Sequence, residues 1–170
     1  ITNGKPLSPD KRDPSFTYDA YGANGIIGKA EKPNVNEPCV VLGKIGSCGS
    51  LHRSPGPCWV TNNAFAVREG ASGSLEYAWW TLRVIDFSQF VGGSANPYMP
   101  LKNFGHHPVL KPPQPVLDEF QAVTGVMRQQ IEARDAENAT LADIRDTLLP
   151  KLISGELRIP DAERIVSEVT

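Results

Sequence analysis

Cysteine and histidine are the residue types most able to do chemistry in this chain, and they cluster in one stretch. Cys39, Cys48 and Cys58 lie on either side of His52. A zinc site would favour cysteine ligands separated by only two residues, and no pair here has that spacing. Cys48 and His52 could form a nucleophile and a base, but nothing in the sequence orients the histidine. We therefore expect ordinary thiols, no bound metal and no catalytic residue.

Two short motifs invite comparison with enzymes. "SANPYMP" (residues 94–100) is similar to the Asn-Pro-Pro-Tyr motif of adenine methyltransferases, but only one proline follows Asn96. No glycine-rich turn from strand to helix precedes it to bind a cofactor, so we interpret it as a turn. "GKIGSCGS" (residues 43–50) lacks the Gly-Lys-Ser/Thr that closes a phosphate-binding loop. The sequence thus predicts no cofactor.

The elements that must position these residues are short and rich in β-formers. Residues 39–46, 58–69 and 76–85 are runs typical of strands, and most glycines and prolines of the chain lie between such runs. The last run, "EYAWWTLRVI", could equally be a helix, because its apolar residues fit neither period cleanly. We expect an irregular α+β domain.

A proline-rich segment, residues 109–115, ends this region, and a helical pattern follows. We expect one helix over residues 114–150, about ten turns and roughly 50 Å long, ended by Pro150. Gly155 then allows the tail, residues 151–170, to turn back. The stripe recurs at spacings of three and four and comprises Leu117, Phe120, Thr124, Met127, Ile131, Arg134, Asn138, Leu141, Arg145 and Leu148, widened by Val123 and Ile144.

Two interpretations of this helix stay open. It could pack along its own domain, or it could pair with another helix. Arg134 and Asn138 make the middle of the stripe polar, which is more typical of a coiled-coil seam whose register must be specified. We favour the seam. Leu148, Leu152, Ile153 and Leu157 offer further apolar contacts, either to a partner or to the helix itself.

Charge divides the chain in the same place. Residues 1–113 contain eleven Lys and Arg against eight Asp and Glu, whereas residues 114–170 contain six against eleven. A mildly basic domain can approach phosphates through a local patch, and an acidic helix is repelled by the same phosphates. We therefore expect the helix to contact protein.

Length and composition indicate the general class of protein. A chain of 170 residues with 40% hydrophobic residues can bury one sizeable core. No apolar run approaches the ~20 residues of a membrane span, and the odd number of cysteines favours a reducing compartment, so we expect a cytoplasmic protein. Ile1 is not a methionine and lies in what looks like the end of a strand, which suggests a fragment of a longer chain.

Several motifs, taken in order, resemble a known family. They are "YGANGIIG" (residues 21–28), "VVLGKIGSCGSL" (40–51), "WVTNNAFAV" (59–67), "GGSANPYM" (92–99) and "LADIRDTLLPKLISGELRIPDAE" (141–163). Together they resemble one half of a specificity subunit of a type I restriction-modification system. The resemblance implies a target-recognition domain, residues 1–113, followed by a long helix that pairs as an antiparallel coiled coil. It also implies recognition of one part of a split target in double-stranded DNA.

Partners follow from the same resemblance. It implies docking of methyltransferase subunits, through them of the restriction subunit, and pairing with a second half-subunit or a second copy of the chain. For the helix contact we expect Leu117, Phe120, Met127, Ile131, Leu141, Ile144 and Leu148. For DNA, short polar side chains on loops suit groove and phosphate contacts. The candidates are Asn24, Lys44, Ser47, Ser50, His52, Arg53, Asn62 and Asn63.

A different class of function fits the same sequence. The chain could be an assembly protein whose helix dimerises and whose domain holds a protein or peptide. Salt-dependent binding to duplex DNA distinguishes the two, because release of counterions from phosphates makes DNA binding weaken steeply with salt.

Overall fold

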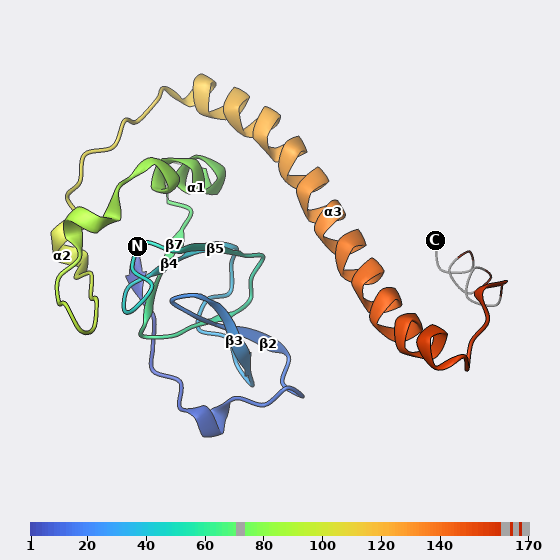
Figure 1. Ribbon diagram of the computed structural model, residues 1–170. Coiled ribbons are helices and arrows are strands. Elements are labelled where there is room, and N and C mark those ends of the chain that lie inside the picture. Colours follow the sequence, from blue (N-terminus) through green and yellow to red (C-terminus); the bar gives the residue numbers. More distant parts are fainter. Residues whose placement is uncertain (71–73, 161–163, 165–166, 168–170) are drawn as a thin grey trace. The chain divides into compact units, whose positions relative to one another are not determined.

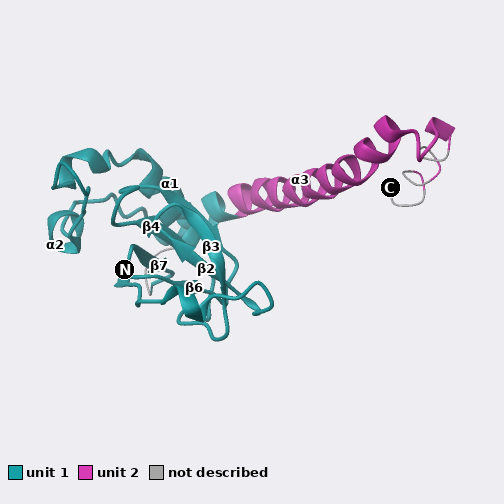
Figure 2. Cartoon of the chain, turned by 60° about the horizontal axis from the view of Figure 1, so that its bottom comes forward, with its two compact units in different colours: residues 1–121 teal, residues 122–170 magenta. Residues whose placement is uncertain are grey.

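The computed structural model describes residues 1–70, 74–160, 164 and 167. The chain forms two compact units, Ile1–Gln121 and Ala122–Thr170, coloured separately in Figure 2. The first unit contains all the strands, the short helices and the first two turns of the long helix α3. Most of the elements are labelled in Figure 1.

The first unit is built around a sheet of four strands in the order β1-β7-β4-β5. Its strands are β1 (Thr2–Asn3), β7 (Ala64–Arg68), β4 (Cys39–Gly43) and β5 (Leu51–Ser54), and each neighbouring pair is antiparallel. Every residue of β4 is buried. A strand covered on both faces has no solvent side, which explains why residues 39–43 form a continuous apolar run rather than an alternating one.

A smaller sheet has the order β3-β2-β6. Strands β2 (Tyr18–Gly22) and β3 (Gly25–Ala30) form an antiparallel hairpin, and β6 (Trp59–Val60) lies parallel to β2. The register of the hairpin shifts between Ala20 and Tyr21, opposite Gly28, whose φ of 140° only glycine adopts easily.

The core lies on both faces of β4. Cys39 and Val41 face the smaller sheet and pack with residues such as Tyr21 and Val60. Val40 and Leu42 face the other way. Their cluster takes in Phe65, Leu82, Phe87, Met99 and Phe104, with aromatic rings meeting edge to face at 5.5 Å for Phe65 and Phe104. The first unit thus has three layers, with the central sheet between the smaller sheet and the helices.

The run at residues 76–85, which the sequence left open between strand and helix, is a helix. Residues 76–85 lie mostly within α1 (Leu75–Val84), which precedes the 3-10 helix Phe87–Phe90 and α2 (Leu101–Phe104). The side chain of Ser74 caps α1 by accepting a hydrogen bond from the backbone N–H of Tyr77 at 3.3 Å. The helical stripe consists of Leu75, Ala78, Trp79 and Leu82, which pack on the central sheet.

The long helix α3 runs over Gln114–Ser154, 41 residues or roughly 60 Å, and includes Pro150. The expected end at Pro150 is therefore wrong. Proline there removes a hydrogen bond to the carbonyl of Asp146, but both residues are exposed and water can satisfy that carbonyl. The helix ends at Gly155, where φ is 74° and the N–H donates to Leu152 O at 3.2 Å.

Part of the expected tail, residues 151–170, lies outside the residues that the structure describes. Among residues 151–170, positions 161–163, 165–166 and 168–170 are not described. In the part of the chain that is described, no helix combines the length and the apolar character needed to cross a membrane.

Candidate nucleic-acid interface

Several connecting segments meet at one end of the two sheets, which we call the loop end. The strand register brings them there: the last residue of β4, Gly43, lies opposite the first residue of β7, Ala64. In the smaller sheet Tyr21 pairs with Val60, so β2 and β6 end side by side. The loop end therefore contains residues 23–24, 44–50, 61–63 and, by contacts described below, 92–98.

Hydrogen bonds join these segments into one frame. The backbone N–H groups of Lys44 and Ile45 donate to Asn63 O at 2.9 and 3.2 Å. The one O–H of Ser50 is shared between Ala23 O and Ser47 O. Because each segment is tied to the next, the side chains they carry keep fixed relative positions.

The loop over residues 44–50 is closed tightly on itself. Gly43 N donates to Ser50 O at 2.8 Å and Gly49 N donates back to Gly43 O at 3.0 Å. A Cβ atom at Gly43 would lie 2.0 Å from the carbonyl oxygen of Ser47. Only glycine permits this close approach of two backbone segments.

Lys44 is the cation held within the loop end. Its Nζ donates to Asn3 Oδ1 at 2.9 Å. The same Nζ lies 5.4 Å from the ring centre of Phe65 and 5.6 Å from that of Tyr98. Attraction to the faces of the two rings holds the ammonium group in place without neutralising it.

The structure brings six of the predicted DNA-binding residues to the loop end. Among them Asn24, Ser47, Asn62 and Asn63 are exposed, and Lys44 and Ser50 are half-buried. Together they offer amide groups that donate and accept, hydroxyl groups, and one positive charge. This set of groups can bind a polar, negatively charged surface.

Arg53 does not join them. Both of its terminal nitrogens contact the carboxylate of Glu76 on α1, with Nη2 at 2.9 Å from Oε2. The guanidinium also stacks over the ring of Trp79, 4.3 Å from its centre. Arg53 therefore connects β5 to α1.

His52 points to the opposite face of β5, since successive side chains of a strand alternate. It lies opposite Val41, and its ring packs against Gly25, where a Cβ atom would come within 3.3 Å of it. Its Nε2 is buried and has no partner among the described residues. Strand alternation thus separates His52 and Arg53, two neighbours that were expected to act together.

The three thiols make contacts with other groups of the first unit. Cys48 Sγ donates to Lys44 O at 3.1 Å, and burial raises the pKa of Cys48. Cys39 and Cys58 are buried, with their sulfur atoms 3.9 Å apart. The hydrogen bond with Cys58 and then burial raise the pKa of Cys39. Within the described ranges no three His, Cys, Asp or Glu side chains form a group that could hold a metal ion.

Residues 92–98 also belong to the loop end, and the sequence interpretation of a simple turn missed this. Gly46 N donates to Pro97 O at 2.8 Å, and Met99 N donates to Lys44 O at 2.9 Å. The signal that could have found them is an exposed Asn and Ser within a Gly-Gly and Pro turn.

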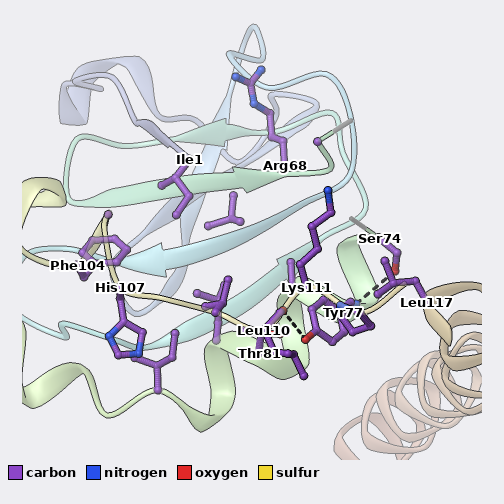
Figure 3. A pocket seen from close by; sticks show the side chains of 18 residues that line it. Ile1, Arg68, Ser74, Tyr77, Thr81, Phe104, His107, Leu110, Lys111 and Leu117 are labelled. Atoms are coloured by element: carbon purple, nitrogen blue, oxygen red, sulfur yellow. Dashed lines mark hydrogen bonds between the residues drawn. The ribbon is translucent and has the colours of Figure 1, made fainter. Parts of the chain in front are cut away.

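An apolar pocket of about 460 Å³ lies toward the far end of β7 (Figure 3). It is lined by α1, the segment leading to α3, and residues such as Val67 and Phe104. The hydroxyl of Tyr77 donates to Leu110 O at 2.8 Å across it. The polar loop end and this apolar pocket are thus separate features of the first unit.

The predicted helix-contact residues divide between the two units. Leu117 is 2% exposed, and Phe120 meets Tyr77 edge to face at 5.9 Å, so both pack within the first unit. In the second unit Met127, Ile131 and Leu141 are about half exposed, at 56%, 49% and 47%. Ile144 and Leu148 are intermediate.

No family model matches the chain. A specificity subunit of the type I restriction enzyme MjaIX from Methanocaldococcus jannaschii is 34% identical over 71 residues, which are 42% of this chain and 16% of that protein. The specificity subunit of the type I restriction enzyme EcoprrI from Escherichia coli is 21% identical over 141 residues, 77% of this chain and 35% of that protein.

The fold is similar to the crystal structure of the S subunit of a type I restriction-modification system from M. genitalium. The TM-score is 0.68 at 15% identity, over 90% of this chain and 42% of that one. This chain therefore spans less than half the length of the proteins it matches. The resemblance to type I specificity subunits, and the fold of a β-rich domain followed by one long helix, are confirmed.

Proposed function

We propose that the chain is a sequence-specific DNA-recognition module of a type I restriction-modification complex, which reads one half of a bipartite target. The observation that supports this best is the loop end, where exposed amide and hydroxyl groups are mounted on a hydrogen-bonded frame beside Lys44. The names of the matched proteins, all specificity subunits, point the same way.

The two kinds of group have different roles. The ammonium of Lys44 and the hydroxyl of Ser47 contact phosphates, which position the protein without reading sequence, while the hydroxyl of Ser50 holds the frame by donating to backbone carbonyls. The amides of Asn62 and Asn63 contact base edges, because an amide can pair with adenine through two hydrogen bonds in the major groove. Asn24 lies at the tip of the β2–β3 hairpin, also at the loop end.

The functional division we propose follows the sequence. Residues 1–113 carry target recognition, residues from 114 onward form the spacer helix, and the tail from 151 onward contributes to docking. The spacer extends past the expected residue 150 to Ser154, because α3 continues to that point. Leu148, Leu152, Ile153 and Leu157 contact a partner helix or a methyltransferase subunit.

Pairing of α3 in an antiparallel coiled coil would use the exposed side chains Met127, Ile131 and Leu141, with Ile144 and Leu148 beside them. A helix of roughly 60 Å spans about 18 base pairs at 3.4 Å each. That length suffices to hold two recognition domains over separate parts of one duplex. The second domain comes from a second copy or from another half of a longer subunit, and a two-fold dimer reads a symmetric split site.

The module itself is non-catalytic in this proposal. It places methyltransferase subunits on the DNA, and through them the restriction subunit, in the cytoplasm. The three thiols and the imidazole of His52 are engaged in internal contacts of the first unit. Purified chain should transfer no methyl group from S-adenosylmethionine to DNA, and clear turnover would contradict the proposal.

Exchange of the recognition domain tests the main claim. Residues 1–113 are replaced by the corresponding domain of another type I specificity subunit, and methylated sites are mapped with the methyltransferase subunits present. The recognised half-site should change to that of the donor. Methylation at the original site would refute the assignment, and salt-independent binding to duplex DNA would favour a protein-assembly module.

Inserting one heptad after Arg134 tests the helix as a spacer. Seven residues add roughly 10 Å, or about three base pairs, and keep the seam in register. The distance between half-sites should lengthen while the half-sites stay the same. An unchanged distance would refute the spacer.

A further inference from the structure

Residues 92–98 form a closed and rigid loop. Gly92 N donates to Tyr98 O, and Tyr98 N donates to Gly92 O, both at 2.9 Å. Gly93 has a φ of 83°, and a Cβ atom there would lie 2.8 Å from Asn96 O. The turn is therefore too tight for any residue but glycine at position 93.

This loop is fixed to the loop that carries Lys44. Ile45 and Tyr98 form an antiparallel bridge, Gly46 N donates to Pro97 O, and Met99 N donates to Lys44 O. Met99 is fully buried among the aromatic rings of the core. The base of the loop is thus anchored on both sides, and its tip cannot move independently of Lys44.

The tip itself is polar and open. Residues 92–96 are exposed, and Tyr98 is 41% exposed beside the ammonium of Lys44. Among the hydrogen bonds between described residues, none uses the side chain of Ser94 or Asn96. Both side chains keep their full capacity to donate and accept.

The turn does not itself explain Asn96. Asparagine is common in turns because it tolerates positive φ or because its amide bonds to nearby backbone. No described residue other than glycine has a positive φ. The amide of Asn96 makes no such local bond in the described structure, so neither structural reason applies.

We propose that residues 92–98 are a specificity-determining loop, in which Asn96 and Ser94 contact base edges while Lys44, fixed beside Tyr98, contacts the adjacent phosphate. This rests on the proposed function and adds residues to it. A rigid loop tied to a phosphate contact sets the position of the amide relative to the bases, which is the condition for reading a base pair through two hydrogen bonds.

The test is selection of preferred sequences from randomised duplex DNA with the full chain. Asn96→Ala should lose roughly 5- to 150-fold of its discrimination at one or two base pairs, the range for one bidentate contact. Its affinity for random DNA and its melting temperature should stay those of the wild type. Gly93→Val, which pushes against Asn96 O, should lose discrimination at the same base pairs.

Asn36→Ala is the matched control. Asn36 is also an exposed asparagine, but it lies just before Cys39, the first residue of β4, whereas the loop end follows the last residue of that strand. This variant should select the wild-type sequence. If Asn96→Ala also selects the wild-type sequence, the loop inference is wrong and the proposed function stands. If the wild-type chain selects no sequence at all, both are wrong.

Discussion

The β-rich unit and the long helix use their surfaces in opposite ways. At the loop end of the first unit the exposed side chains are polar, and hydrogen bonds between backbone segments hold the frame beneath them. Along α3 in the second unit, apolar side chains such as Met127 and Ile131 face solvent. A fixed polar surface suits selective recognition, whereas an exposed apolar stripe suits burial against another chain.

Ion pairs show the same contrast. Arg53 and Glu76 connect β5 to α1 with side chains that are 18% and 13% exposed. On α3, Arg134 pairs with Glu137 three residues away, with side chains 75% and 55% exposed. The first pair joins distant parts of the chain, while the second supports only its own helix turn. The first unit therefore has tertiary stabilisation that the middle of α3 lacks among its own described residues.

The largest effect is expected from a charge in the middle of the exposed stripe. Ile131→Glu should weaken pairing of the chain by at least about 100-fold, or roughly 3 kcal/mol, because a carboxylate would be buried against an apolar partner. Sedimentation equilibrium measures this change. Gln129→Glu, on the far side of the helix, is the control and should pair like the wild type. A wild-type chain that is monomeric at micromolar concentration would refute the pairing.

The next effect concerns the link between β5 and α1. Arg53→Ala leaves the carboxylate of Glu76 poorly solvated, so the free energy of unfolding should fall by about 2–4 kcal/mol in urea denaturation. Arg68→Ala removes a pair with Glu37 whose side chains are 41% and 47% exposed, and it should cost at most about 1 kcal/mol. Equal losses for the two variants would remove the distinction between structural and surface cations.

A smaller and more selective effect is expected at the β6–β7 turn. Asn62→Ala should lower discrimination at one base pair by about 1–3 kcal/mol, because its exposed amide is proposed to contact a base edge. Binding to matched and singly mismatched duplexes measures this. Binding to random DNA should be unchanged, and an equal loss on specific and random DNA would contradict base reading.

The smallest effect is expected at Lys44. Lys44→Met keeps the aliphatic stem between the rings of Phe65 and Tyr98 but removes the charge. The plot of log affinity against log salt should become shallower by about one, with the same loss on every sequence. Lys32→Met, at an exposed position after β3, is the control for overall charge. A loss that depends on sequence would place Lys44 on a base instead.

Local patterns in the sequence were enough to predict much of the fold. The apolar run at residues 39–43 predicted β4, and the recurrence at three and four residues predicted α3, because both signals come from neighbours along the chain. The same kind of signal was present for α1 in Leu75, Ala78, Trp79 and Leu82. It was masked by Trp80 and Val84, which are exposed and therefore blur the apolar stripe.

The candidate site was only partly accessible from sequence. Residue type identified Asn62, Asn63 and Lys44 as loop residues with polar groups, but composition gave no information on which loops would meet. Strand register brought residues 44–50 to residues 61–63, and it was the contact of Pro97 with Gly46 that added residues 92–98. The sequence by itself determined the strands, the long helix and the polar character of the loops, since each depends on residues close along the chain.

Tertiary structure decided which of the predicted side chains are free to contact DNA or a partner helix. Arg53 and Glu76 are 23 residues apart, and they meet only because β5 and α1 pack together. His52 turns to the other face of the same strand, and Leu117 is buried although its spacing fits the seam. Contacts between residues distant in sequence depend on how the layers pack, and the pattern of any one segment does not contain that information.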